Sequence, residues 1–88
     1  MPDTPLNPET PHARTVRTVL ARELGLPADR IAPGDRLDEL PEVDSVKLAR
    51  AVARLEEILG VELDDDELFD TRTVGDLCCV VDRATRPA

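Results

Sequence analysis

The sequence predicts an all-α protein, a small bundle of three main helices and one short helix, with a long loop between the first two helices. The chain has 88 residues, which suffices for one domain. It contains one Phe and neither Trp nor Tyr, so its core must consist of Leu, Val, Ile and Ala. Sheet proteins favour β-branched and aromatic side chains, whereas this composition favours packed helices. Apolar residues also recur at helical spacing in three separate segments.

The first helix is expected to follow a disordered, proline-rich leader at residues 1–10. Thr10 can cap this helix, with Pro11 at its first position. Gly25 and Pro27 end it, because glycine adopts the left-handed conformation of a helix C-terminus and proline cannot continue a helix. The inward face carries Val16, Val19, Leu20 and Leu24 at helical spacing.

Residues 26–44 form the long loop of this prediction. Proline and glycine interrupt the segment repeatedly, so no long helix fits. A loop of this length in a small domain is uncommon and is often functional. The loop has to cross the bundle, and four spaced apolar residues can anchor it on the core: Leu26, Ile31, Leu37 and Leu40.

The second helix is expected over residues 45–59, where Gly60 stops it. An acidic turn and a short helical turn around residues 67–69 follow. Thr73 is the expected cap of a last helix that runs to about Arg83. The expected inward residues are Leu48, Ala51, Val52, Leu55 and Leu59 in the second helix, and Val74, Leu77, Cys78 and Val81 in the last.

The net charge of the chain is −8, from 19 acidic and 11 basic residues. An acidic surface repels phosphate, so nucleic acids and anionic membranes are not expected partners. No apolar run approaches the length needed to cross a bilayer, and the N-terminus lacks the pattern of a signal peptide. We therefore expect a cytoplasmic protein that is monomeric on its own.

No set of residues for catalysis or metal binding can be assembled from the sequence. A hydrolytic triad needs a base, and the one histidine, His12, is expected to be solvated beside the leader. The carboxylates of residues 64–67 lack the spacing of an EF-hand, so an acidic turn that caps the short helix is favoured over a metal site. Cys78 and Cys79 are adjacent, so at most one sulfur can point inward, and packing is favoured over redox chemistry.

Ser45 lies at the start of the expected second helix and admits two interpretations. As an ordinary residue it would be the N-cap, since a serine hydroxyl accepts a hydrogen bond from the first turn. The free N–H groups of a helix N-terminus also suit a phosphate ester, and Asp44 could then share the capping. No base lies beside Ser45 in the sequence, so another enzyme would have to modify it. Local chemistry alone favours the cap.

The segment from Asp44 to Leu77 reads DSVKLARAVARLEEILGVELDDDELFDTRTVGDL. It contains a "DS" pair before an aliphatic residue, then LEEILGVEL, an acidic turn and TVGDL, without gaps. With these motifs in this register the chain resembles the acyl carrier proteins of fatty acid and polyketide synthesis, and the related peptidyl carrier proteins. The match extends into the first helix, with its LARELGL ending.

The resemblance implies a four-helix carrier domain over residues 11–85, with residues 86–88 as a tail. It implies that Ser45, next to the motif residue Asp44, receives a 4′-phosphopantetheine arm from coenzyme A through a separate, magnesium-dependent transferase. The terminal thiol of the arm then carries an acyl chain as a thioester. The chain itself would be a tether, without catalytic residues or a metal site.

Family members commonly dock through the exposed side of the second helix. Two features of this chain depart from the family pattern. Glu42 stands three residues before the serine, where the family often has Gly. The second helix sums to +1 over residues 45–59, whereas it is usually acidic in carriers of fatty acid synthesis, so partners of altered charge are expected. The expected docking residues are Val46, Lys47, Ala49, Arg50, Ala53 and Glu57.

These implications favour a discrete acyl carrier protein of secondary-metabolite or antibiotic biosynthesis, of the polyketide type. The expected partners are a phosphopantetheinyl transferase, a ketosynthase, an acyltransferase or adenylating loading enzyme, and tailoring enzymes. One alternative is a free-standing peptidyl carrier protein that is loaded with an amino acid in nonribosomal peptide biosynthesis. Another, from a different class, is an unmodified helical interaction domain in which Ser45 is only a cap.

Overall fold

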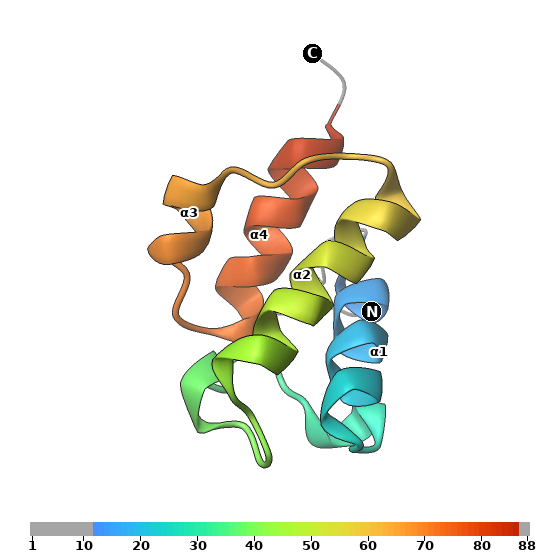
Figure 1. Ribbon diagram of the computed structural model, residues 1–88, viewed down its shortest axis with the longest axis vertical. Coiled ribbons are helices and arrows are strands. Elements are labelled where there is room, and N and C mark those ends of the chain that lie inside the picture. Colours follow the sequence, from blue (N-terminus) through green and yellow to red (C-terminus); the bar gives the residue numbers. More distant parts are fainter. Residues whose placement is uncertain (1–11, 87–88) are drawn as a thin grey trace, which may run out of the picture.

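The computed structural model describes residues 12–86 and confirms the predicted all-α fold (Figure 1). Within these residues there is no strand, only a single bridge between Arg36 and Thr73. The elements are α1 (Ala13–Leu24), η1 (Ala28–Arg30), η2 (Leu37–Glu39), α2 (Ser45–Leu59), α3 (Asp65–Phe69) and α4 (Val74–Thr85), where η marks a 3₁₀ turn.

Helix α1 ends where the sequence predicts and begins at Ala13. The predicted cap, Thr10 with Pro11, lies outside the described residues. His12 occupies the N-cap position, and its side chain makes no capping hydrogen bond. At the other end Gly25 adopts a left-handed conformation with φ 71°, and both Gly25 and Leu26 donate their backbone N–H to the carbonyl of Ala21. This arrangement satisfies the carbonyl of Ala21, one of the last in the helix.

The long connection between α1 and α2 is anchored by the predicted apolar residues. Ile31, Leu37 and Leu40 are buried, and Leu26 is half-buried against the same core. The two 3₁₀ turns in this segment were not predicted. Each spans three residues, so each adds a local turn without changing the course of the loop.

Backbone hydrogen bonds fasten this connection to the start of α4. Val74 donates to the carbonyl of Asp35 at 2.9 Å, and Gly75 donates to the carbonyl of Pro33 at 2.8 Å. A Cβ atom at Gly75 would lie 3.1 Å from the Pro33 oxygen, so glycine permits this close approach. The TVGDL motif therefore places the loop that leads to α2.

Helix α1 packs against both α2 and α4, and the aliphatic core lies between these three helices (Figure 1). Leu20 and Val16 of α1, Leu55 of α2, and Val74 and Val81 of α4 are its most deeply buried large side chains. The core contains no buried polar side chain among the described residues. Cys78 is buried and Cys79 is exposed, as helical geometry predicts for adjacent residues.

Side chains cap the two C-terminal helices as the sequence predicts. The carboxylate of Asp64 accepts from the backbone of Asp66 and Glu67, so the acidic turn caps α3, which begins at Asp65 and is longer than the predicted turn. Thr73 and Asp76 form a reciprocal capping box at the start of α4. No helix in the described part of the chain is long and apolar enough to cross a membrane.

Candidate functional site

The N-terminus of α2 is capped by Asp44, one residue before the serine. Asp44 has an extended backbone, with φ −150° and ψ 172°, and its Oδ1 accepts from the backbone N–H of Lys47 at 2.7 Å. Ser45 is the first residue of the helix itself. The interpretation of Ser45 as the N-cap is therefore wrong, because the neighbouring carboxylate, a stronger acceptor than a hydroxyl, takes the cap.

The hydroxyl of Ser45 is left free by this arrangement. Ser45 is exposed, and none of its side-chain atoms hydrogen-bonds to another residue within 12–86. It stands at the positive end of a 15-residue helix, where the backbone N–H groups of the first turn favour a negatively charged group. A phosphate ester on Ser45 would displace no existing contact.

A tight turn leads from η2 to this helix start. The N–H of Val43 donates to the carbonyl of Leu40 at 3.1 Å, which closes a four-residue turn. Pro41 occupies its second position, and Glu42 occupies the third with φ 65°. These features define a type II turn, whose third position strongly favours glycine. The chain thus keeps the left-handed conformation at the position where the family often has Gly, although the residue is Glu.

Lys47 holds this turn from within α2. Its ammonium Nζ donates to the carbonyl of Glu42 at 2.9 Å, while its backbone N–H donates to Asp44. The side chain is accordingly half-buried. Lys47 was expected to face a docking partner, and the structure gives it an internal contact as well.

The other expected docking residues lie exposed along α2. Val46, directly after the serine, is 59% exposed, which is unusual for a large aliphatic side chain. The rest of the expected set is exposed too: Ala49, Arg50, Ala53 and Glu57. This surface remains a prediction, and the structure places it on the same helix as Ser45.

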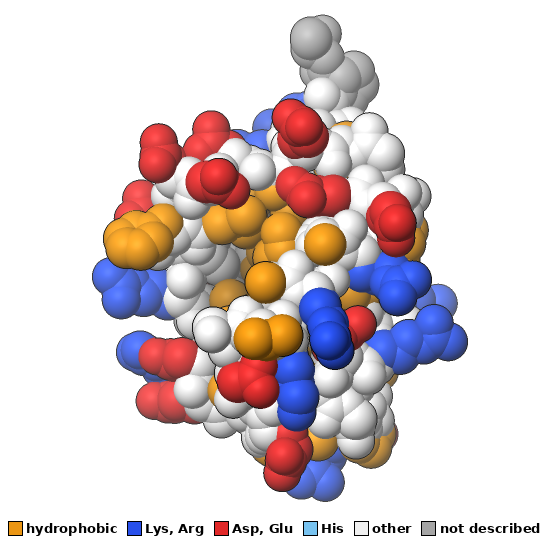
Figure 2. All heavy atoms as spheres, viewed as in Figure 1, with side chains coloured by type: hydrophobic (Ala, Val, Ile, Leu, Met, Phe, Trp, Pro, Cys, Tyr) orange, Lys and Arg blue, Asp and Glu red, His pale blue; other side chains and the backbone are white. Residues whose placement is uncertain are grey.

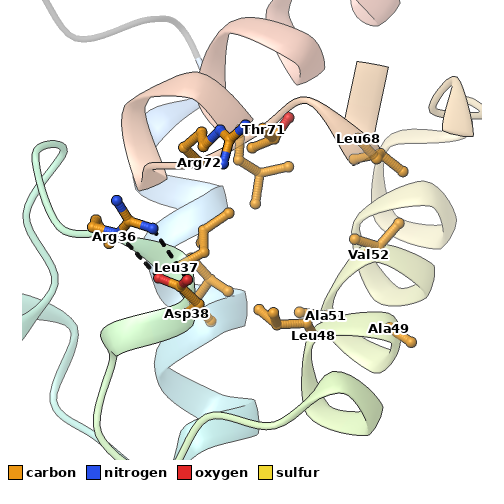
Figure 3. A pocket seen from close by; sticks show the side chains of 12 residues that line it. Arg36, Leu37, Asp38, Leu48, Ala49, Ala51, Val52, Leu68, Thr71 and Arg72 are labelled. Atoms are coloured by element: carbon orange, nitrogen blue, oxygen red, sulfur yellow. Dashed lines mark hydrogen bonds and ion pairs between the residues drawn. The ribbon is translucent and has the colours of Figure 1, made fainter. Parts of the chain in front are cut away.

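An apolar hollow of about 300 Å³ lies between α2 and α3 (Figure 3). Leu48 and Val52 of α2 face Leu37 of η2 across it, and Leu68 closes the side toward α3. The sequence placed Leu48 and Val52 in the core, but both are only half-buried. One feature of the sequence could have indicated the hollow. The apolar stripe on α2 is wider than the part of the helix surface that α1 covers, so some of its apolar side chains are left only partly buried.

Polar side chains stand at the rim of the hollow. Arg36 donates from Nε to Oδ1 of Asp38 and from Nη2 to Oδ2, both at 3.2 Å. This hydrogen bonding holds the pKa of Asp38 below its usual value and raises the pKa of Arg36. Arg72 and Thr71 also line the hollow (Figure 3).

Charge is distributed unevenly over the surface. Six carboxylates and no basic residue lie between positions 62 and 70. In Figure 2 acidic side chains gather along the top of the view, over α3 and the segment before it, and basic side chains gather on the right, while both signs of charge occur at the left and at the bottom. The net positive charge of α2 and the acidic segment 62–70 therefore belong to different parts of the folded chain.

The acidic segment serves structural roles. Asp64 caps α3, and Glu67 forms an ion pair with Arg83 of α4 at 2.6 Å. No group of three or more potential metal ligands is found among residues 12–86. Phe69 of α3, the one aromatic residue of the chain, is 90% exposed beside these carboxylates.

Comparison with known proteins agrees with this geometry. Residues 14–80 match the family model described as the phosphopantetheine attachment site. The acyl carrier protein MbtL of Mycolicibacterium paratuberculosis is 35% identical over 71 residues, which cover 81% of this chain and 80% of that protein. MbtL of Mycobacterium tuberculosis is 36% identical over 63 residues, or 72% of this chain and 75% of that protein.

The chain belongs to the acyl and peptidyl carrier protein family. It is a carrier rather than a catalyst, and its cofactor is covalently attached 4′-phosphopantetheine. A carrier of this kind interacts with a phosphopantetheinyl transferase and with biosynthetic enzymes. This membership disfavours the alternative of an unmodified helical interaction domain.

Proposed function

We propose that Ser45 is the attachment site of the 4′-phosphopantetheine arm. The observation that carries this proposal is the exposed hydroxyl at the first residue of α2, which has no hydrogen-bond partner among residues 12–86, beside an N-cap that Asp44 supplies independently. In the transfer the Ser45 oxygen forms a bond to the phosphorus that bears pantetheine, and the pyrophosphate bond of coenzyme A breaks. Adenosine bisphosphate leaves, and the serine proton passes to the transferase.

The apolar hollow is the proposed resting place of an acyl chain. Ser45 and Ala49 are four residues apart on α2, so they share a face of the helix, and Ala49 lines the hollow. An arm that folds back from Ser45 thus reaches this opening within about one helical turn. Aliphatic walls favour an apolar chain, because its burial removes hydrocarbon from water.

The cargo that we propose is an acyl intermediate of polyketide-type biosynthesis, handled in the cytoplasm. The support is the resemblance to acyl carriers and the names of the relatives, which are acyl carrier proteins. A peptidyl carrier that receives an amino acid remains the second candidate, since the two kinds of carrier share one fold. A loading assay distinguishes the acyl carrier from the peptidyl carrier. For an acyl carrier, an acyltransferase with a malonyl donor should load the arm, and an adenylating enzyme with an amino acid should not.

The proposed partners are dedicated enzymes whose docking surface is acidic. Arg50 and Arg54 are exposed on α2 and form no ion pair within the described chain. Like charges across an interface weaken binding, so a partner evolved for an acidic helix would be a poor match. Arg50→Glu and Arg54→Glu should each raise the KM of the cognate partner for the carrier. Arg30→Glu, on η1, serves as the control.

Peptide mapping of the modified protein tests the attachment site. After reaction with coenzyme A and a transferase, the fragment that contains Ser45 should carry the arm. A modified fragment from any other part of the chain would overturn the proposal.

A further inference from the structure

The turn before Ser45 contains a residue, Glu42, that disfavours the conformation of the turn. Glu42 adopts φ 65° at the third position of a type II turn, where glycine is the natural choice. The left-handed conformation disfavours an L-residue because its Cβ approaches the following carbonyl oxygen, which reduces the population of that conformation by roughly tenfold. Some contact outside the turn has to favour the observed conformation.

Lys47 supplies this contact. Its Nζ donates to the Glu42 carbonyl at 2.9 Å, and its backbone N–H donates to the Asp44 carboxylate at 2.7 Å. The two acceptors flank Val43, which packs half-buried against the core. One residue of α2 therefore ties down both sides of the segment that enters the helix. Among the described residues no carboxylate lies within ion-pair distance of this ammonium, so its bond to the turn has no competitor there.

The position of Ser45 depends on this turn. Ser45 follows the cap directly, so the angle at which the chain enters α2 sets where its hydroxyl lies. A transferase has to bring the phosphorus of coenzyme A to that hydroxyl, and small displacements of a reacting group slow such reactions strongly. If the turn opens, Asp44 moves with it and the first turn of α2 loses its cap.

We propose that Lys47 is a positioning residue for the modification of Ser45, because its bond to the Glu42 carbonyl holds the strained turn closed. The proposal rests on the attachment of the arm at Ser45. It assigns a single coupled role to two residues of this chain, the Glu at the third turn position and the Lys two residues after the serine. With glycine at position 42 the turn would not need the bond from Lys47.

The test is a double-mutant cycle on the rate of phosphopantetheinyl transfer, with Lys47→Met, Glu42→Gly and the two combined. Lys47→Met should raise the KM of the transferase for the carrier by about tenfold with kcat unchanged, because the competent conformation becomes a minor one. Lys47→Arg, which keeps a donor, should recover most of the loss. Glu42→Gly combined with Lys47→Met should restore the wild-type KM, because glycine adopts the turn without help.

Arg50→Met is the matched control, since it also removes a long basic side chain from α2. Arg50 does not hold the turn, so any effect of Arg50→Met should be the same with Glu42 or Gly at position 42. If the KM of the transferase is still raised in the double variant Lys47→Met with Glu42→Gly, Lys47 acts in partner docking and the proposal is overturned. Wild-type transfer rates in Lys47→Met would overturn it as well. Failure of the wild-type protein to accept the arm would overturn the attachment site itself, which is a separate result.

Discussion

The carboxylate of Asp44 lies 2.7 Å from the backbone nitrogen of Lys47 and caps α2. From the sequence, one serine could both cap α2 and carry the modification. In the structure the contact from Asp44 assigns the cap to a different residue. Asp44 holds the start of the helix, and Ser45 is exposed, with no hydrogen bond from its hydroxyl to another residue in the described part of the chain. A carrier gains from this division, because modification of the serine does not remove the cap.

The division predicts unequal losses of stability for two adjacent alanine substitutions. Asp44→Ala should lower the free energy of unfolding by about 1 kcal/mol, the usual effect of losing an N-cap. Ser45→Ala should change it by less than about 0.5 kcal/mol, as expected for an exposed residue whose side chain makes no hydrogen bond within residues 12–86. Urea denaturation of the unmodified proteins measures both values. A larger loss for Ser45→Ala than for Asp44→Ala would return the capping role to the serine.

The capping box of α4 predicts a loss of stability in acid. Backbone N–H groups of Arg72 and Thr73 donate to the Asp76 carboxylate and hold its pKa below the usual value near 3.8. Because the pKa of Asp76 is lower in the folded state than in the unfolded state, its carboxylate stabilises the fold fully at pH values above the unfolded pKa. This stabilisation is lost as the pH falls through the folded pKa. The free energy of unfolding, followed from pH 7 to acid, should fall less steeply for Asp76→Asn. Parallel curves for the two proteins would contradict the assignment.

The apolar hollow predicts that cargo stabilises the fold. A medium-length acyl chain on the arm should raise the melting temperature by several degrees over the protein with an empty arm, because binding to the native state stabilises it. Val52→Phe should abolish this increase, since Val52 faces the hollow and a larger side chain occupies its space. Ile58→Phe is the control, because Ile58 is exposed and does not line the hollow. Equal increases in all three proteins would place the chain elsewhere.

The two cysteines should differ in reactivity. Cys79 is exposed and Cys78 is buried, and alkylation requires access to the thiol. The native protein without its arm should therefore take up one iodoacetamide, and Cys79→Ser should take up none. Both sites should react in denaturant. Rapid double alkylation of the native protein would show that α4 opens readily.

Much of the fold could be predicted because its signals are local. Gly25 and Gly60 end α1 and α2 in left-handed conformations, and Thr73 begins α4, and each of these residues acts through its own backbone or side chain. The spaced apolar residues of the long loop could also be predicted as its anchors, because few other apolar residues compete for the core in that segment.

The details of the site required the structure. Asp44 and Ser45 are both good N-cap residues, so the sequence alone could not decide which of the two caps α2. The hollow between α2 and α3 depends on how far α3 stands from α2, a distance that no local pattern contains. The conformation of Glu42 and its contact with Lys47 join residues whose roles look independent in the sequence.

The most direct test of the attachment site is intact mass spectrometry after incubation with coenzyme A, magnesium and a promiscuous phosphopantetheinyl transferase. The wild-type protein should gain one phosphopantetheinyl group, and Ser45→Ala should gain none while keeping the same circular dichroism spectrum. Cys79→Ser should gain the group as the wild type does. A gain that survives Ser45→Ala, or no gain by the wild-type protein, would contradict the assignment of Ser45 as the site that carries the arm.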